Sequence, residues 1–267
     1  MKGREVSFQC GETERRGELY IPEENPSPGL VICHGMSKHG FRATELYRKL
    51  AQTACKHGFA SLVFDFRGCG KSGGRFDYGV GERQDVLCAI NYLASRSEVI
   101  SNKIFVVGHS LGGAVALYAV QDEPRVRGLA LWATPSDHAH NVKKFIVKTR
   151  GLLSYHLFLF LSYVDALVGL PGFFHIKVYG ISLRPRCVRE KLMRLNECET
   201  VSKLRNVPVL VVVGDKDEIV DVEEARKVYS SSNEPKEFMI VRSANHVFEG
   251  KEEEVVERTV RWMKRWV

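Results

Sequence analysis

The chain has 267 residues, of which 44% are hydrophobic and 27% are charged. This length and composition exclude an intrinsically disordered chain and suit a globular protein that buries a large core in one domain. The formal net charge of +7 is uneven, because twelve Lys and Arg outnumber four Asp and Glu between His138 and Arg205, while the rest of the chain is close to neutral.

The first residues, the cysteines and the longest apolar stretch indicate where in the cell the protein is expected. The first twenty residues are charged throughout and lack the apolar stretch of a secretory signal. The seven cysteines form no CxxC pair and have no regular spacing, which favours reduced thiols and leaves a disulfide open. The longest apolar stretch, Leu152 to Leu170, contains His156 and Asp165, so a buried or lid helix is expected there rather than a membrane span. We therefore expect a cytoplasmic protein without an integral membrane span.

Short apolar runs alternate with longer amphipathic stretches along the chain. In chain order, the predicted elements are the hairpin strands Glu5–Gln9 and Gly17–Ile21, strand Gly29–Cys33, helix Ala43–His57, strand Ala60–Phe64, helix Glu82–Ser95, strand Lys103–Val107, helix Gly112–Gln121, strand Val126–Trp132, strand Val207–Val213, helix Val222–Ser230, strand Glu237–Val241 and helix Glu252–Trp266. This alternation predicts an α/β fold in which a mostly parallel central sheet is flanked by helices. In such sheets, functional sites form at the carboxyl ends of the strands.

Residues 135–206 do not follow the alternation. A connection of this length without structure of its own is uncommon in a compact domain. Its leucine-rich and aromatic part, from Leu152 to Tyr163, predicts helices that pack over the core. We expect a helical cap, residues 135–206, inserted before the penultimate strand, and a core formed by residues 1–134 and 207–267.

The segment Gly108-His109-Ser110-Leu111-Gly112 follows a predicted strand and opens a predicted helix. A serine hydroxyl is a useful nucleophile only where it is exposed, oriented and next to a base. A sharp strand–turn–helix elbow exposes it, and glycines two positions away on each side relieve the crowding of the turn. The same glycines would also suit an ordinary strand–helix turn. We predict that Ser110 is the nucleophile and that the His109 side chain points away from it.

The base and the acid are expected after the cap. His246 is the only histidine beyond residue 206, and it lies in the loop after the last predicted strand, from which it can reach Ser110. The loop that begins at Gly214 offers Asp215, Asp217 and Glu218 as the acid that orients the imidazole.

These motifs resemble those of the α/β-hydrolases, with His34-Gly35, DFRGCGKSGG, GHSLGG, GDKDEIV and NHVF in the family's order. The chain is most similar to the branch that contains small carboxylesterases, feruloyl or cinnamoyl esterases, and monoacylglycerol lipases. The resemblance implies the α/β-hydrolase fold. It also selects Asp217, three residues after Gly214, as the acid, and leaves Asp215 as a turn residue.

The tetrahedral intermediate of acyl transfer needs N–H donors that are already in place. The backbone of Leu111, directly after the nucleophile, is expected to supply one. The resemblance assigns the other to the backbone of Met36, with Ser37 as an alternative, and leaves His34 to brace this loop.

We therefore expect a carboxylesterase-like serine hydrolase that cleaves esters with hydrophobic acyl or alcohol groups through an acyl-enzyme. The apolar part of the cap would line its pocket. A thioesterase, a monoacylglycerol lipase and an aminopeptidase use the same triad and stay open, as does a non-catalytic ligand-binding protein.

No cofactor or metal is expected. The loop DFRGCGKSGG lacks the spacing of a phosphate-binding loop, and its Asp65 and Arg67 are expected to fix the loop. Asp137-His138-Ala139-His140 suits a solvated cap hinge better than a metal site. The basic cap residues are not interleaved with base-stacking aromatics, which disfavours nucleic acid. A small-molecule ester is the expected partner, and a homodimer is left open.

Overall fold

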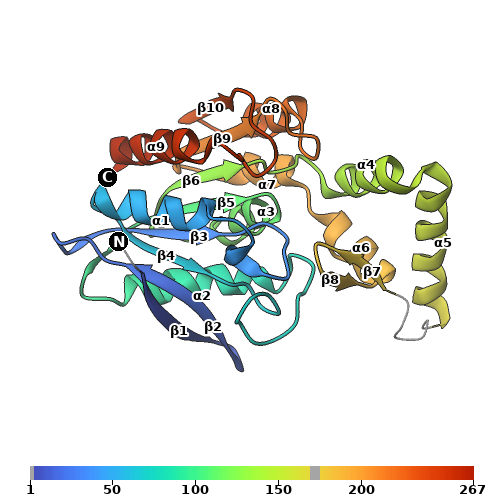
Figure 1. Ribbon diagram of the computed structural model, residues 1–267, viewed down its shortest axis with the longest axis horizontal. Helices are drawn as coiled ribbons and strands as arrows, with labels where there is room; N and C mark the ends of the chain where they lie inside the picture. Colours follow the sequence, from blue (N-terminus) through green and yellow to red (C-terminus); the bar gives the residue numbers. More distant parts are fainter. Residues whose placement is uncertain (1–2, 169–174) are drawn as a thin grey trace.

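The computed structural model describes residues 3–168 and 175–267, and these form an eight-stranded sheet with helices on both faces (Figure 1). The strands are β1 Arg4–Cys10, β2 Thr13–Tyr20, β3 Ser27–Cys33, β4 Ala60–Phe64, β5 Val99–His109, β6 Val126–Trp132, β9 Val209–Gly214 and β10 Lys236–Val241. Their order across the sheet is β1-β2-β4-β3-β5-β6-β9-β10. β2 pairs antiparallel with β1 and with β4, and the remaining neighbours are parallel. The predicted mostly parallel sheet is confirmed.

The burial of each strand explains its sequence. In β4 and β9 all side chains are buried, because helices cover both faces, and both strands are accordingly apolar runs. In the edge strand β1, by contrast, only Phe8 and Cys10 are buried, and they alternate with exposed polar residues. The alternation places one face of β1 against the core.

Five helices of the described residues flank the sheet: α1 Leu46–Lys56, α2 Glu82–Ala94, α3 Leu111–Ala119, α8 Val222–Ser231 and α9 Glu252–Met263. α1 and α9 bury Leu50 and Val256 in one core cluster, and α2 and α3 bury Ile90 and Val115 in a second. The predicted helix Ala43–His57 is shorter in the structure, since a 3-10 turn, Gly40–Ala43, precedes α1.

A long insertion separates β6 from β9. It contains α4 His138–Arg150, α5 Leu152–Val168, β7 Ile176–Val178, β8 Ile181–Leu183, α6 Pro185–Glu190 and α7 Glu197–Lys203. Figure 1 shows α4 leading away from the sheet to α5, which lies farthest from it. The expectation of helices alone missed the antiparallel hairpin β7–β8, whose three-residue strands are too short to give a periodic pattern. Residues 169–174, which include the end of the predicted apolar stretch, lie outside the described residues.

Helix α5 is not a core helix. Phe158, Ser162 and Asp165 are buried, but Leu153 is 83% exposed and Phe160 is 63% exposed. One side of α5 therefore faces the protein and the other faces solvent. Within residues 3–168 and 175–267, no helix is long and apolar enough to cross a membrane.

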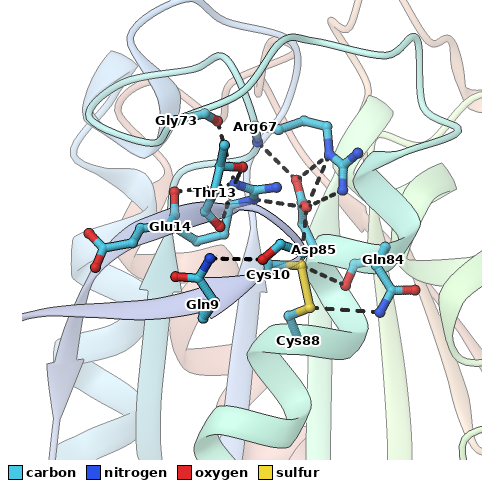
Figure 2. Close-up of a disulfide and its surroundings, with 11 residues drawn as sticks. Gln9, Cys10, Thr13, Glu14, Arg67, Gly73, Gln84, Asp85 and Cys88 are labelled. Carbon is cyan, nitrogen blue, oxygen red and sulfur yellow. Dashed lines mark hydrogen bonds and ion pairs between the residues drawn. A yellow bond between two sulfur atoms is a disulfide. The ribbon is translucent and has the colours of Figure 1, made fainter.

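A disulfide joins Cys10 of β1 to Cys88 of α2 (Figure 2). Beside it, the buried carboxylate of Asp85 forms ion pairs with Arg15 at 2.8 Å and with Arg67 at 2.7 Å. The expectation of reduced thiols is therefore wrong for these two cysteines. Their pairing could not be inferred from spacing, because 78 positions separate them. The disulfide fastens the edge strand to the helix that covers it.

Candidate active site

The turn between β5 and α3 holds Ser110 in an unusual backbone conformation. Its φ of 53° and ψ of −123° lie in a region that non-glycine residues rarely adopt, and its N–H donates to the Trp132 carbonyl at 2.7 Å. A Cβ on Gly108 would lie 2.5 Å from the Gly112 carbonyl oxygen, and one on Gly112 would lie 2.3 Å from that of His34. Only glycine fits at both positions, which is why the motif has this spacing.

The structure brings Ser110, His246 and Asp217 together. The Nε2 atom of His246 lies 3.1 Å from Ser110 Oγ, and its Nδ1 atom lies 2.8 Å from Asp217 Oδ2. The other oxygen of the buried Asp217 carboxylate accepts the backbone N–H groups of Ile219 at 2.8 Å and Val220 at 2.9 Å. One carboxylate oxygen is thus fixed by its own loop, and the other is directed at the imidazole. In this geometry an imidazole can take the serine proton and the carboxylate can stabilise the imidazolium.

The other acidic candidates of this loop point elsewhere. Asp215 Oδ1 accepts the backbone N–H of Ser243 at 2.6 Å, and Glu218 pairs with Lys148 of α4. Asp217 is therefore the carboxylate that contacts His246, as the resemblance implied.

The His109 side chain points away from that of Ser110, as expected, and it joins two loops of the site. The Gly35 N–H donates to Tyr47 Oη at 3.0 Å, Tyr47 Oη lies 2.8 Å from His109 Nδ1, and His109 Nε2 lies 2.8 Å from the His246 carbonyl oxygen. Burial lowers the pKa of His109 to about 3, so its ring is neutral. A neutral ring that donates from Nε2 to a carbonyl accepts the Tyr47 hydroxyl at Nδ1. No sequence signal indicates Tyr47, which lies in a helix 62 positions before His109.

The loop after β3 lies beside Ser110, since a Cβ on Gly35 would be 3.4 Å from Ser110 Cβ. Met36 of this loop and Leu111 line one cavity together with Ser110. Leu111 is the first residue of α3, and the first N–H groups of a helix have no partner within it. Ser37 Oγ instead accepts the N–H of His39 at 3.1 Å.

Two side chains brace the neighbouring loops. His34 Nε2 accepts the N–H of Phe66 at 3.0 Å, and burial lowers the pKa of His34. Asp65 accepts the N–H groups of Phe41 at 3.0 Å and Lys71 at 2.9 Å. Both residues act on the backbone, as expected for residues that fix a loop.

The cavity has a volume of about 400 Å³, within the range of small-molecule sites. Its core wall includes Met36, Ser110, Leu111 and His246. The opposite wall belongs to the insertion and is mostly apolar, with Val142, Phe145, Ile146, Leu157, Phe158 and Val178 among its residues. The cavity thus runs between Ser110 and the insertion.

The expectation of a solvated segment at Asp137–His140 is wrong for His138, which is buried, whereas His140 is exposed. Asp137 caps α4 by accepting the N–H groups of Ala139 and His140, and His138 is 6% exposed. His138 lines the cavity, and its Nδ1 lies 2.8 Å from the buried carboxylate of Glu197. Across the described residues, no three His, Cys, Asp or Glu side chains are grouped to hold a metal ion.

Relatives match along most of the chain. An uncharacterized protein of Mycobacterium tuberculosis is 25% identical over 248 residues, which cover 91% of this chain and 72% of that protein. A monoglyceride lipase homolog of monkeypox virus is 24% identical over 271 residues, covering 94% of this chain and 92% of the homolog. Among solved structures, Est1E from Butyrivibrio proteoclasticus with ferulic acid bound superposes with a TM-score of 0.74 at 20% identity, covering 98% of each chain.

A family model described as "Serine aminopeptidase, S33" matches residues 24–160, which is more than half of the chain. The matched region contains Ser110 and the strands on both sides of it. The chain therefore belongs to this family of hydrolases, and its fold is that of the α/β-hydrolases.

Proposed function

We propose that the protein hydrolyses carboxylic esters with hydrophobic groups and that Ser110 forms the acyl-enzyme. The observation that carries this proposal is the hydrogen-bonded series Ser110, His246 and Asp217, which opens onto a largely apolar cavity of about 400 Å³. A relative described as a monoglyceride lipase homolog and a structural neighbour, Est1E, with ferulic acid bound support esters as the class of substrate.

The chemistry follows from the positions of these atoms. Ser110 Oγ attacks the ester carbonyl carbon while its proton passes to His246 Nε2, and Asp217 stabilises the imidazolium. The backbone N–H groups of Met36 and Leu111 bind the oxyanion of the tetrahedral intermediate. Its collapse breaks the carbon–oxygen bond, and the leaving alcohol takes the proton from His246. Water then attacks the acyl-enzyme with His246 as base, which releases the acid and restores Ser110.

We further propose that residues 135–206 act as the cap of this site, over a core of residues 1–134 and 207–267. Their apolar side chains form the cavity wall opposite Ser110. An apolar wall of this extent favours hydrophobic acyl or alcohol groups.

An aminopeptidase is disfavoured by the charges of the cavity. Such an enzyme has to hold the protonated amino terminus of a peptide, for which a carboxylate is the suitable partner. Of the described residues that line the cavity, none is Asp or Glu. A thioesterase and a monoacylglycerol lipase would use the same steps and differ only in the group that leaves. A ligand-binding protein without turnover would not need the two contacts that join Ser110, His246 and Asp217.

The cytoplasmic location and the homodimer stay predictions. The disulfide between Cys10 and Cys88 weighs against the location, because disulfides are rare in a reducing cytosol. Mass spectrometry of alkylated protein isolated from its own cells would show whether the two thiols are paired there.

The test of the proposed function is the hydrolysis of p-nitrophenyl esters from acetate to palmitate by the wild type and by Ser110→Ala. We expect activity in the wild type and none above background in the variant. Ser202→Ala, a surface serine of α7, is the matched control and should keep full activity. A folded wild type that cleaves none of these esters would contradict the proposal, and cleavage of aminoacyl p-nitroanilides instead would identify a peptidase.

A further inference from the structure

The cavity contains a second imidazole that is paired with a carboxylate, besides His246 with Asp217. His138 Nδ1 lies 2.8 Å from Glu197 Oε1, and the two residues are 6% and 0% exposed. His138 lines the cavity, whereas the Glu197 side chain lies behind it, outside the cavity wall formed by the described residues. The other oxygen of this carboxylate, Oε2, has no hydrogen-bond partner among them. Glu197 therefore serves to hold the His138 ring.

The bond to Glu197 determines what the other edge of the His138 ring can do. A carboxylate accepts the proton of Nδ1, so Nε2 is the polar atom of the ring that stays available. Nε2 has no hydrogen-bond partner in residues 3–168 and 175–267, and it is still reached by solvent. Because the ring lines the cavity, the cavity is where Nε2 meets solvent.

Asn141 supplies a second polar group one turn further along α4. Residues three positions apart share one side of a helix, and Asn141 also lines the cavity. Its Nδ2 atom donates to the Ile219 carbonyl at 3.0 Å, which fixes the orientation of the amide. Its Oδ1 atom has no partner in the part of the chain that the structure describes and is likewise reached by solvent. Two polar atoms thus lie side by side on the α4 wall of the cavity.

These two atoms lie at the Ser110 end of the cavity. The N–H of His138 donates to the Leu195 carbonyl at 3.3 Å. The side chains of Leu195 and Leu111 meet at Gly79, where an added Cβ would lie 2.9 Å from Leu195 Cδ1 and 3.5 Å from Leu111 Cδ1. Leu111 directly follows Ser110, so the start of α4 lies close to the turn that holds Ser110.

The chemistry of this wall suits a hydroxyl group that is followed by an alkyl chain. Nε2 accepts a hydrogen bond when the ring is neutral and donates one when it is ionised, and a hydroxyl can do both, so it can bond to Nε2 in either state. When the ring is ionised, the same hydroxyl can accept from Nε2 and donate to the amide oxygen. Helix α4 then leads away from the sheet (Figure 1), and its next cavity-lining residues, Val142, Phe145 and Ile146, are apolar.

We propose that His138, with Asn141 beside it, binds a hydroxyl group on the acyl chain of the substrate. In the acyl-enzyme only the acyl half is attached to Ser110, and the cavity that Ser110 lines has to hold it. The inference rests on the proposed function and specifies its substrates. These are esters of fatty acids that carry a hydroxyl group close to the carboxyl group, on the second or third carbon.

The test measures kcat/KM for the ethyl esters of decanoic acid and of its 2-, 3- and 10-hydroxy derivatives, with the released acid titrated at constant pH. The ethyl group keeps the alcohol half constant, so the ratio to the plain decanoate reports the hydroxyl alone. We expect the better of the 2- and 3-hydroxy esters to exceed the plain ester by about fivefold, the effect of one hydrogen bond. The 10-hydroxy ester should show no such preference, because its hydroxyl lies at the far end of the chain.

Variants assign the preference to a residue. His138→Asn should lower the ratio by about fivefold, because an asparagine amide can still donate to Glu197 from the position of Nδ1 but has no atom at the position of Nε2. His140→Asn is the matched control. His140 is an exposed histidine of the same helix, its Nε2 lies 3.6 Å from Glu224 Oε1, and it lies outside the cavity wall formed by the described residues. The control should keep the ratio of the wild type.

The outcomes separate this proposal from the proposed function. Equal losses for hydroxylated and plain esters in His138→Asn, or no preference for either the 2- or the 3-hydroxy ester in the wild type, would overturn the hydroxyl site and leave ester hydrolysis intact. If no ester is cleaved, the proposed function fails, and titration calorimetry of decanoate and of its 2- and 3-hydroxy derivatives with Ser110→Ala decides the site. Tighter binding of a hydroxy acid that His138→Asn removes supports the site, and equal or absent binding overturns it.

Discussion

Side chains that join the sheet to its helices are almost completely buried, whereas many of those on α5 are exposed. Leu50 and Val256 of the flanking helices are at most 1% exposed, while Leu153 and Leu167 of α5 are both 83% exposed. Ser110 and His246 are half-buried, but they lie on loops that leave this densely packed part of the chain, at the ends of β5 and β10. Other residues of α5, Leu157, Phe158 and Leu161 among them, form part of the far wall of the cavity. We infer that chemistry and substrate selection are divided between a rigid part and a more loosely packed part of the chain.

The largest expected effect is a loss of activity on substitution of Asp217. Asp217→Asn should lower kcat for p-nitrophenyl esters by about 10⁴-fold, because an amide cannot stabilise the imidazolium and favours the wrong tautomer of His246. Asp215→Asn is the matched control, since Asp215 accepts the Ser243 N–H and does not contact His246. Steady-state kinetics of both variants measure the effect. A loss of activity in Asp215→Asn as large as that in Asp217→Asn would contradict the assignment.

Paired leucine substitutions test the difference in packing directly. Leu50→Ala should lower the free energy of unfolding by about 2–5 kcal/mol, because it empties space in a close-packed core. Leu153→Ala should change it by less than about 0.5 kcal/mol, because this side chain is already in solvent. Urea unfolding followed by circular dichroism gives both values. A similar loss in the two variants would show that α5 is packed as tightly as the core.

The buried carboxylate of Glu82 lies near the contact between the sheet with its flanking helices and the insertion. Glu82 accepts the N–H groups of Asp77 at 2.6 Å and Gly79 at 2.8 Å, and burial raises its pKa from 4.5 to about 7. The same loop contacts the insertion, since Tyr78 Oη accepts the N–H of Arg184 at 2.8 Å. Glu82 therefore holds a loop on which the insertion rests.

This raised pKa predicts a pH dependence of stability. The unfolded chain loses the Glu82 proton near pH 4.5 and the folded protein keeps it to about pH 7, so the free energy of unfolding should fall as pH rises between these values. The contribution is about 3 kcal/mol at most. Urea unfolding at pH 5 and pH 8 should show a smaller difference in Glu82→Gln than in the wild type. An unchanged difference would mean that other groups produce it.

The smallest expected effect concerns Tyr47, whose hydroxyl links the loop after β3 to His109. Tyr47→Phe removes the hydroxyl between Gly35 and His109, which should cost about 1–2 kcal/mol of stability and lower kcat/KM about fivefold. Tyr20→Phe is the control, because its equally buried hydroxyl donates to Glu18 and lies outside the site. Both variants should lose stability, but only Tyr47→Phe should lose kcat at constant KM. Equal kinetics in the two variants would leave Tyr47 a purely structural role.

The fold could be predicted from the sequence wherever the type of side chain follows a regular local pattern. Apolar runs, and in β1 an alternation of polar and apolar residues, predicted each strand of the main sheet, although β2 and β5 begin four residues before their predicted starts. Gly108 and Gly112 predicted the turn at Ser110, because steric crowding at that turn admits no other residue. Residue types alone could not choose between Asp215 and Asp217, since both follow the same strand. The choice depends on which carboxylate the loop turns towards His246, and the resemblance supplied it. The catalytic role of these residues stays a prediction.

What could not be predicted depends on contacts between distant positions. The pairing of Cys10 with Cys88 and the bond of Tyr47 to His109 join residues 78 and 62 positions apart. Neither leaves a periodic or spaced pattern in the chain. The burial of His138 was not predicted for the same reason, because its partner Glu197 lies 59 positions later in the sequence.

The insertion leaves and rejoins the sheet on neighbouring strands. β6 and β9 pair directly, with Leu129 opposite Val209 and Trp132 opposite Val212. Because the two strands are parallel, the insertion leaves the sheet at the carboxyl end of β6 and returns at the amino end of β9, on the opposite edge of the sheet. The chain makes this return through α7, which packs against α3 and α8. The described residues of the insertion that line the cavity all precede α7. An exchange of this earlier part alone, for that of another family member, would therefore test whether the substrate range can be changed while the return crossing of the chain is kept.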